Sequence, residues 1–184
     1  MHPLLTPIDR PGPFMRLVYR VARRQYGKVL TPLRVIYSRA PVLLMVGLLI
    51  EWIRNHALSL EPELILLVGA RVSAHHGCDF CHDLGQALAI QRGIGPERFR
   101  ELHQWRESHA FTPRQRAALA WVDDILDDGA IDAATLEESR AIFSERELVE
   151  LTWMQASETY FNVQAHPLGI SSDGLAAIAR RASP

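Results

Sequence analysis

The sequence predicts an all-α protein that folds as a single domain of about seven or eight helices. Apolar residues recur with the spacing of a helix along most of the 184-residue chain. No stretch alternates apolar and polar residues for long enough to indicate a β-strand. Prolines and capping motifs recur where the apolar stretches begin, as they do in the first turn of helices. A chain of this length with 48% hydrophobic residues can bury a sizeable core.

Helix boundaries follow from local signals. Four helices are expected in the first half of the chain, over residues 14–26, from Pro41, from just after Ser59 to near Gly77, and from Cys78 to near Gln91. Four more are expected from near Pro96, from Pro113 to near residue 132, from Glu145 to near His166, and over residues 174–181. Thr112 and Ser144 each open a capping box, with Gln115 and Glu147 at the third helical position. Residues 30–41 are expected to form a linker with a turn at Thr31 and Pro32, and the apolar face of the first helix is expected to contain Phe14, Leu17, Val18 and Val21.

Charge and hydrophobicity limit the partners and the compartment. The most apolar segment, residues 40–50, is too short to cross a bilayer and meets Glu51 at once, so a buried helix or a subunit interface is expected and a membrane partner is not. The first residues do not resemble a signal peptide, which predicts a cytoplasmic protein. The net charge of −1 argues against nucleic acid as a partner. Five cationic residues near the N-terminus predict a solvated helix face or a surface for an acidic partner: Arg16, Arg20, Arg23, Arg24 and Lys28.

The segment SAHHGCDFCHDLG, residues 73–85, contains both cysteines of the chain. Cys78 to His82 spells CxxCH, the attachment motif of c-type haem, but haem is attached outside the cytoplasm and no second axial ligand stands out. A structural zinc site needs four ligands, usually as two separated pairs. The chain offers one such pair, and its nearby histidines, His75, His76 and His82, are too close together in sequence to complete a tetrahedron. Neither a cofactor nor a metal is therefore predicted, which leaves a redox dithiol or two small buried side chains.

The position of the cysteines favours the redox dithiol. Gly77 can end one helix, and Cys78 then stands at the start of the next. The backbone N–H groups and the dipole at a helix N-terminus favour a thiolate and lower the thiol pKa. Residues three positions apart share one face of a helix, with Cα atoms about 5 to 6 Å apart, which suits a disulfide. A reversible Cys78–Cys81 disulfide is therefore geometrically easy.

Three segments resemble the carboxymuconolactone decarboxylase and alkylhydroperoxidase D-like superfamily and occur in the order typical of it. They are LEPELILLVGARVSAHHGCDFCHDLGQALA, FTPRQRAALAWVDDI and FSERELVELTWMQASETYFNVQAHPLGI. The resemblance covers residues 55–170, with residues 1–54 as an N-terminal helical extension and residues 171–184 as a short C-terminal helix and tail. It implies the alkylhydroperoxidase D-like helical fold and a homo-oligomer, a trimer or a hexamer. The decarboxylase branch lacks CxxC, so the motif places the resemblance with the peroxidase branch.

The resemblance also implies a reaction. Cys81, the second cysteine, would attack an organic hydroperoxide or hydrogen peroxide and become a sulfenic acid. Cys78 would then condense with it to form the disulfide. A dithiol reductant, either a protein or a small molecule, would restore both thiols by exchange. This reaction needs no cofactor.

The proton relay departs from the family pattern. That pattern is Glu, eleven residues, CxxC, three residues and His, but Leu66 and Gly85 stand at the Glu and His positions. We predict that Glu63, one turn earlier on the same helix, or His82, beside Cys81, accepts the thiol proton. Other candidates near the cysteines are His75, His76 and Asp83. Three polar residues of the last long helix are candidates to line the pocket: Glu158, Tyr160 and Asn162.

Two other functions stay open. One is that of a family relative without peroxidase chemistry, which binds a small molecule in a helical oligomer. The other is that of a decarboxylase-like lyase, which acts on a ring compound. In the first of these functions the dithiol is either vestigial or a redox sensor, and its thiol pKa values are ordinary, about 8.5.

Overall fold

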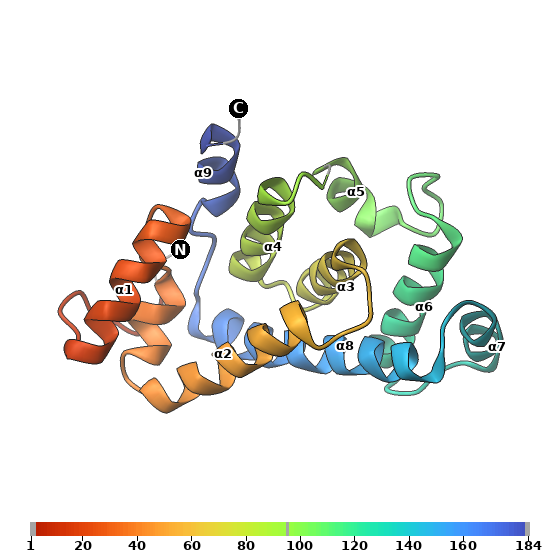
Figure 1. Cartoon of the computed structure of the whole chain (residues 1–184), viewed down its shortest axis with the longest axis horizontal. Helices are drawn as coiled ribbons and strands as arrows, with labels where there is room; N and C mark the ends of the chain where they lie inside the picture. The colour runs from red at the N-terminus through yellow and green to blue at the C-terminus, as the bar shows by residue number, and fades with distance from the viewer. Residues whose placement is uncertain (1–2, 95, 183–184) are drawn as a thin grey trace.

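The computed structural model describes residues 3–94 and 96–182, and these form an all-α fold in one body (Figure 1). Residues 1–2, 95 and 183–184, which include the ends of the predicted N-terminal extension and C-terminal tail, lie outside the described residues. The described part contains nine α-helices and no strand. The helices are α1 (Pro13–Tyr26), α2 (Pro41–His56), α3 (Pro62–His75), α4 (Asp79–Gln91), α5 (Pro96–Glu101), α6 (Pro113–Asp127), α7 (Ala133–Ile142), α8 (Glu145–Ala165) and α9 (Leu175–Ala182). The prediction of an all-α fold is confirmed.

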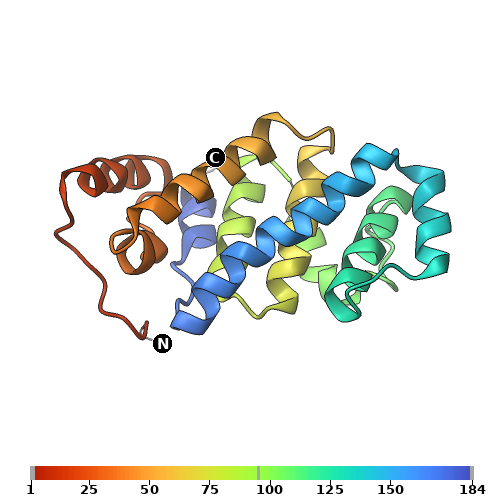
Figure 2. The ribbon, with the colours of Figure 1, turned by 90° about the horizontal axis from the view of Figure 1, so that it is seen from below.

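Helix α3 lies at the centre and contacts α4, α6 and α8. Helix α8 is the longest and runs across α3 and α4, as Figure 2 shows from below. Helix α2 also contacts α8, while α9 packs against α4 and α1. Nine of the fourteen residues of α3 are buried, as expected for a helix that is surrounded by others.

Local signals set several helix starts as predicted. The Thr112 hydroxyl accepts the Gln115 N–H at 3.2 Å, and the Gln115 side chain accepts the Thr112 N–H at 3.0 Å. Ser144 and Glu147 form the same capping box at the start of α8. Each box satisfies two backbone N–H groups that the helix leaves free.

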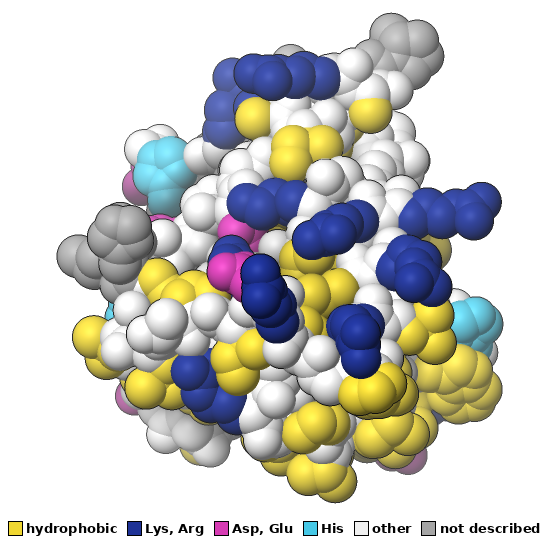
Figure 3. All heavy atoms as spheres, turned by 90° about the vertical axis from the view of Figure 1, so that its left-hand side faces the viewer, with side chains coloured by type: hydrophobic (Ala, Val, Ile, Leu, Met, Phe, Trp, Pro, Cys, Tyr) yellow, Lys and Arg dark blue, Asp and Glu magenta, His cyan; other side chains and the backbone are white. Residues whose placement is uncertain are grey.

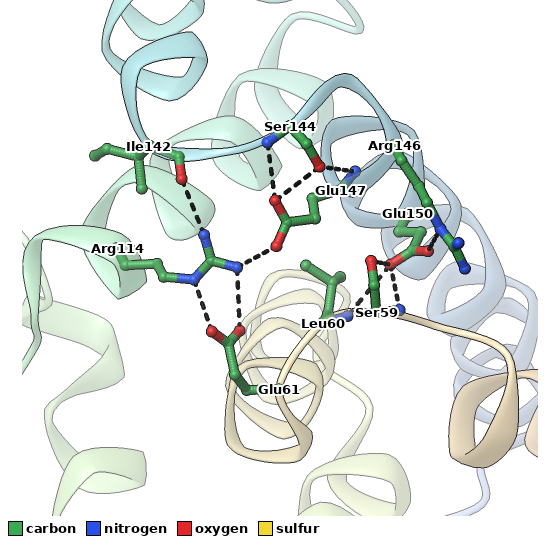
Figure 4. Close-up of polar contacts among 9 residues, drawn as sticks. All are labelled: Ser59, Leu60, Glu61, Arg114, Ile142, Ser144, Arg146, Glu147 and Glu150. Carbon is green, nitrogen blue, oxygen red and sulfur yellow. Dashed lines mark hydrogen bonds and ion pairs between the residues drawn. The ribbon is translucent and has the colours of Figure 1, made fainter.

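The capping box of α8 is tied to two other helices. The Arg114 guanidinium donates to both oxygens of Glu61, at 2.8 and 3.3 Å, and also to Glu147 (Figure 4). It donates further to the Ile142 carbonyl at 3.0 Å. Hydrogen bonds from Ser144 to Glu147, followed by the contact with Arg114, hold the pKa of Glu147 below its ordinary value, although partial burial opposes this. This network joins the starts of α3, α6 and α8.

Three local expectations were wrong. Residues 33–37 were expected in a linker but form a π-helical turn (Leu33–Tyr37), whose buried side chains pack on α1 and α2. Helix α7 was not predicted, because its start is signalled only by Asp132, whose side chain accepts the Ala134 N–H at 2.8 Å. Helix α1 packs through a different face from the predicted one, since its buried residues are Met15, Tyr19 and Ala22. Tyr19 fixes this orientation by donating a hydrogen bond of 2.7 Å to the Ile8 carbonyl.

The face that carries α1 is both basic and apolar. Figure 3 shows Lys and Arg side chains beside hydrophobic ones on this side of the molecule. Phe14, Leu17 and Val21 of α1 are each at least half exposed. The arginines of the N-terminal cluster are exposed on the same helix: Arg16, Arg20, Arg23 and Arg24. Within the described residues, no helix combines the length and the hydrophobicity that a membrane span requires.

Candidate functional site

The two cysteines lie at the turn between α3 and α4, in the geometry that the sequence predicts. Gly77 has φ of +64°, a left-handed conformation that a side chain would strain, and it lets the chain leave α3. Cys78 is the N-cap of α4, and its sulfur accepts the Cys81 N–H at 3.3 Å. Its own N–H donates to the Ser73 carbonyl at 3.0 Å. Cys78 and Cys81 form a disulfide with Cα atoms 5.3 Å apart.

A pocket opens beside Cys81. Its volume is about 230 Å³, and its walls come from the π-helical turn and from helices α1, α2, α3, α4 and α8. Cys81 is 8% exposed and lines this pocket, whereas Cys78 is 1% exposed and packs among buried apolar side chains. Most of the wall is apolar, with Leu33, Ile36, Leu44, Leu66, Leu84 and Phe161 among its residues. A molecule in the pocket therefore meets one sulfur atom and an apolar surface.

Part of the wall is charged. Arg54 of α2 donates to Glu158 of α8, and to Glu51 of its own helix at 2.8 Å. All three residues line the pocket. Burial would lower the pKa of Arg54, but the two carboxylates outweigh it and raise that pKa. Glu158 was predicted as a pocket residue, whereas Arg54 and Glu51 were not, because they stand at the charged end of an apolar helix.

Glu158 is held from three elements. Its Oε1 accepts the Ser73 hydroxyl of α3 at 3.0 Å and the Asn162 amide of α8 at 3.1 Å, while its Oε2 accepts from Arg54. Gly69 of α3 lies against this group, since a Cβ there would be in van der Waals contact, 3.4 Å from Oε2 of Glu158 and 3.5 Å from Arg54 Nη2. The carboxylate is therefore fixed in one position against α3.

Two tyrosines also line the pocket. Burial raises the pKa of Tyr37 to about 12, and the nearby Tyr160 and Glu51 add to the effect. Burial, together with Glu51, likewise raises the pKa of Tyr26, while a hydrogen bond from Gln25 opposes this. Both phenols therefore keep their protons near neutral pH.

The two positions that depart from the family relay pattern both face this pocket. Leu66 and Gly85 are part of its wall. Glu63 is ion-paired with Arg98 on a half-exposed surface and lies outside the pocket lining described above. His82 is also outside that lining, and its Nε2 lies 2.8 Å from the Gln86 amide. The roles assigned to Glu63 and His82 stay predictions.

The remaining candidates have partners elsewhere. Asp83 accepts hydrogen bonds from Ser172, Leu175 and Ala176 at 2.8 to 2.9 Å, which caps α9. His76 lies 3.0 Å from the Thr159 hydroxyl. Partial burial, with the adjacent His75, lowers the pKa of His76, although Glu158 opposes this, so its ring is neutral at pH 7. His75 lies 3.7 Å from Asp127.

The other two pocket candidates of α8 do not line the pocket. Asn162 is fully buried beneath Glu158, and Tyr160 lies outside the pocket lining. Among the described residues, no three side chains of His, Cys, Asp or Glu come close enough together to hold a metal ion.

Comparison with known proteins identifies the family. Residues 51–124, which include α3, the CxxC turn and α4, match the model of the carboxymuconolactone decarboxylase family. The fold matches the crystal structure of an alkylhydroperoxidase AhpD core, a peroxidase-related protein from Ralstonia eutropha JMP134, with a TM-score of 0.82. Residues 51–124 belong to the carboxymuconolactone decarboxylase family, and the chain has the fold of the alkylhydroperoxidase D-like proteins. The predicted resemblance is confirmed.

The individual proteins that this chain resembles are distant in sequence. Uncharacterized protein YnjA of Escherichia coli strain K12 is 27% identical over 150 residues, which is 80% of this chain and 82% of YnjA. The Ralstonia structure is 16% identical over 98% of both chains. A cysteine-to-alanine variant of the debrominase Bmp8, solved with 2,3,4-tribromopyrrole, is 16% identical over the whole of this chain and 99% of Bmp8, with a TM-score of 0.80. At this identity the two structures establish the shared fold. Membership of the superfamily and the CxxC disulfide fit a thiol-based enzyme.

Proposed function

We propose that this protein is a CxxC thiol peroxidase that reduces organic hydroperoxides or hydrogen peroxide. One observation carries the proposal: Cys81 lines an apolar pocket, and its disulfide partner Cys78 is buried next to it. A substrate in the pocket can react with Cys81, and the oxidised Cys81 is then close enough to Cys78 to form the disulfide. This arrangement supports Cys81 as the attacking residue and Cys78 as the resolving one.

The reaction balances with the two thiols alone. The Cys81 thiolate attacks the outer oxygen of the hydroperoxide, an S–O bond forms, the O–O bond breaks, and the leaving alkoxide takes a proton to become an alcohol. The Cys78 thiol then displaces water from the Cys81 sulfenic acid, which gives the disulfide. A dithiol reductant reduces that disulfide by two exchange steps and is itself oxidised.

Intact mass under denaturing conditions tests the proposal. The reduced protein is measured before and after one equivalent of cumene hydroperoxide. We expect a rapid loss of two hydrogens in the wild type, a sulfenic acid that dimedone traps in Cys78→Ser, and no change in Cys81→Ser. An unchanged wild-type mass after minutes, or equal reactivity of all three proteins, would refute the proposal.

A second candidate is reductive removal of halogen from an aromatic ring. The fold shared with the debrominase Bmp8 and the apolar wall around Cys81 favour it. In this reaction the Cys81 thiolate takes the bromine, the ring carbon takes a proton, and Cys78 then releases bromide by forming the disulfide. Bromide released from 2,3,4-tribromopyrrole, at one equivalent for each disulfide formed, would support this candidate over the peroxidase.

We also propose that the protein is a homo-oligomer whose contact includes α2. Five apolar residues of this helix are more than half exposed: Val42, Met45, Leu48, Leu49 and Trp52. So large an apolar surface usually marks an interface, and Leu48 also lines the pocket, so a second copy seated here would border the site. Light scattering should show an oligomer that Leu49→Glu dissociates. Val149→Glu, at a 69% exposed residue of α8, is the control, and a monomeric wild type would refute the proposal.

A further inference from the structure

We propose that Glu158, held by Arg54, is the catalytic carboxylate of this site, and that it carries the proton of Cys81 to the leaving oxygen of the hydroperoxide. The inference rests on the proposed peroxidase function and goes beyond it, because it assigns the relay to helix α8. The family pattern places the carboxylate on α3 at position 66, which is a leucine here.

The position of the Glu158 carboxylate supports this role. Positions 66, 69 and 73 share one face of α3, since they are three and seven residues apart. Glu158 contacts this face at Ser73 and approaches Gly69, one turn from Leu66. Glu158, Leu66 and Cys81 all line the pocket. Glu158 of α8 therefore places a carboxylate against the face of α3 that carries Leu66 at the family's glutamate position.

Residues of three helices hold Glu158 in place. A Cβ at Gly69 would stand 3.4 Å from Oε2, in van der Waals contact, so the α3 backbone lies directly against the carboxylate. Arg54 occupies Oε2, which leaves Oε1 with two neutral donors, the Ser73 hydroxyl and the Asn162 amide. A hydroxyl both donates and accepts, so Ser73 can pass a proton to Oε1. Ser73 is also bound at its carbonyl by the Cys78 N–H, next to the reacting pair.

The step balances as a proton shuttle. Oε1 of Glu158 takes the Cys81 thiol proton, directly or through Ser73 or a water in the pocket. The thiolate then forms the S–O bond, the O–O bond breaks, and the same proton moves from Oε1 to the leaving alkoxide. The carboxylate returns to its charged, Arg54-paired state, so the net change is thiol plus hydroperoxide to sulfenic acid plus alcohol.

Other titratable groups surround this carboxylate. Arg54 faces it from α2 and His76 from the end of α3. Glu51 of α2, Cys81 of α4 and Arg92, the C-cap of α4, line the same pocket. His76 is neutral at pH 7, and Arg54 stays charged throughout the working range. Glu63, the carboxylate expected from sequence, is paired with Arg98 outside the pocket lining.

The test compares two reactions of the same thiol. In a Cys78→Ser background, rates are measured for cumene hydroperoxide and for iodoacetamide between pH 6 and pH 10. The hydroperoxide needs a proton for its leaving oxygen, whereas iodide leaves without one. We expect Glu158→Gln to slow the hydroperoxide reaction about 100-fold at pH 7 and less than about threefold at pH 10, where no proton is left to shuttle. Alkylation by iodoacetamide should be at least as fast as in the parent, because removing a negative charge favours the thiolate.

Control variants separate this role from a structural one. Glu150→Gln removes another buried carboxylate of α8, which is bound by Arg146 and Ser59 outside the pocket lining, and should leave both rates unchanged. Arg54→Met combined with Glu158→Gln removes both charges of the pair, so that the buried Arg54 is not left with the partly exposed Glu51 alone if the single variant does not fold. This double variant should show the same pH-dependent loss of the hydroperoxide reaction.

Several results would overturn the inference. An equal loss of both reactions at every pH would mean that Glu158 is structural. No loss at pH 7, or the pH-dependent loss appearing in Glu63→Gln instead, would exclude Glu158 as the shuttle. These outcomes are distinct from failure of the proposed function, in which the parent protein itself does not react with the hydroperoxide and the inference falls with it.

Discussion

Asp83 offers a sharp test of how the site is built, because its position beside Cys81 made it a candidate proton acceptor. In the structure both of its oxygens are engaged by α9: Oδ2 accepts the Ser172 hydroxyl at 2.9 Å and the Leu175 N–H at 2.8 Å, and Oδ1 accepts the Ala176 N–H at 2.9 Å. It therefore acts as the cap of α9 from a neighbouring helix. We predict that Asp83→Ala destabilises the fold strongly.

The magnitude follows from what the substitution leaves behind. Leu175 and Ala176 are buried, so their N–H groups lose their acceptor without gaining water. Each buried N–H without an acceptor costs about 1 to 3 kcal/mol, and loss of a helix cap alone costs about 1 kcal/mol. These contributions overlap, and we expect Asp83→Ala to lower the free energy of unfolding by about 3 kcal/mol in total. With a urea dependence of about 2 to 3 kcal/mol per molar, the unfolding midpoint should fall by roughly 1 to 1.5 M.

Urea unfolding followed by circular dichroism, at one fixed protein concentration, measures this loss. The matched control is Asp132→Ala, which removes an exposed cap whose side chain accepts the Ala134 N–H at 2.8 Å. Water replaces that acceptor, so about 1 kcal/mol is expected. If Asp83→Ala costs no more than Asp132→Ala, then the buried cap does not hold α9 on α4 and the reasoning fails.

Three other predictions concern the rest of the fold. Gly77→Ala should cost about 1 to 2 kcal/mol in urea unfolding, because φ of +64° strains a residue with a Cβ, and an unchanged midpoint would contradict this. Asp123→Ala should cost about 3 to 5 kcal/mol, since this 1% exposed carboxylate is bound by Arg71 and Arg106; a loss under about 1 kcal/mol would refute the estimate. The lowered pKa of Glu147 makes it stabilising above its ordinary value of 4.5 and progressively less so as pH falls through its folded pKa. The stability of Glu147→Gln should therefore fall less steeply than that of the wild type in acid, and parallel curves would contradict the prediction.

The sequence was sufficient wherever the signal is local. The capping boxes at Thr112 and Ser144, and the CxxC turn after Gly77, appear where the sequence places them. Each depends on backbone groups within one helical turn, so a few neighbouring residues decide the geometry. Helix α7 was missed because Asp132 alone is a weak signal without the partner residue of a capping box.

The pocket and the partners of its residues were decided by the tertiary structure. Arg54 and Glu158 are 104 positions apart, and their pairing depends on how α2 and α8 pack over α3. The partners of Asp83 in α9 likewise lie about 90 positions away in the sequence. Glu63 is ion-paired with Arg98 of another helix, on a partly exposed surface. The sequence by itself determined most of the helices, the CxxC turn and the absence of the usual relay residues. Which carboxylate reaches the pocket was decided by the packing of distant helices, because a side chain's neighbours across the core depend on helix orientations that no short stretch of sequence sets.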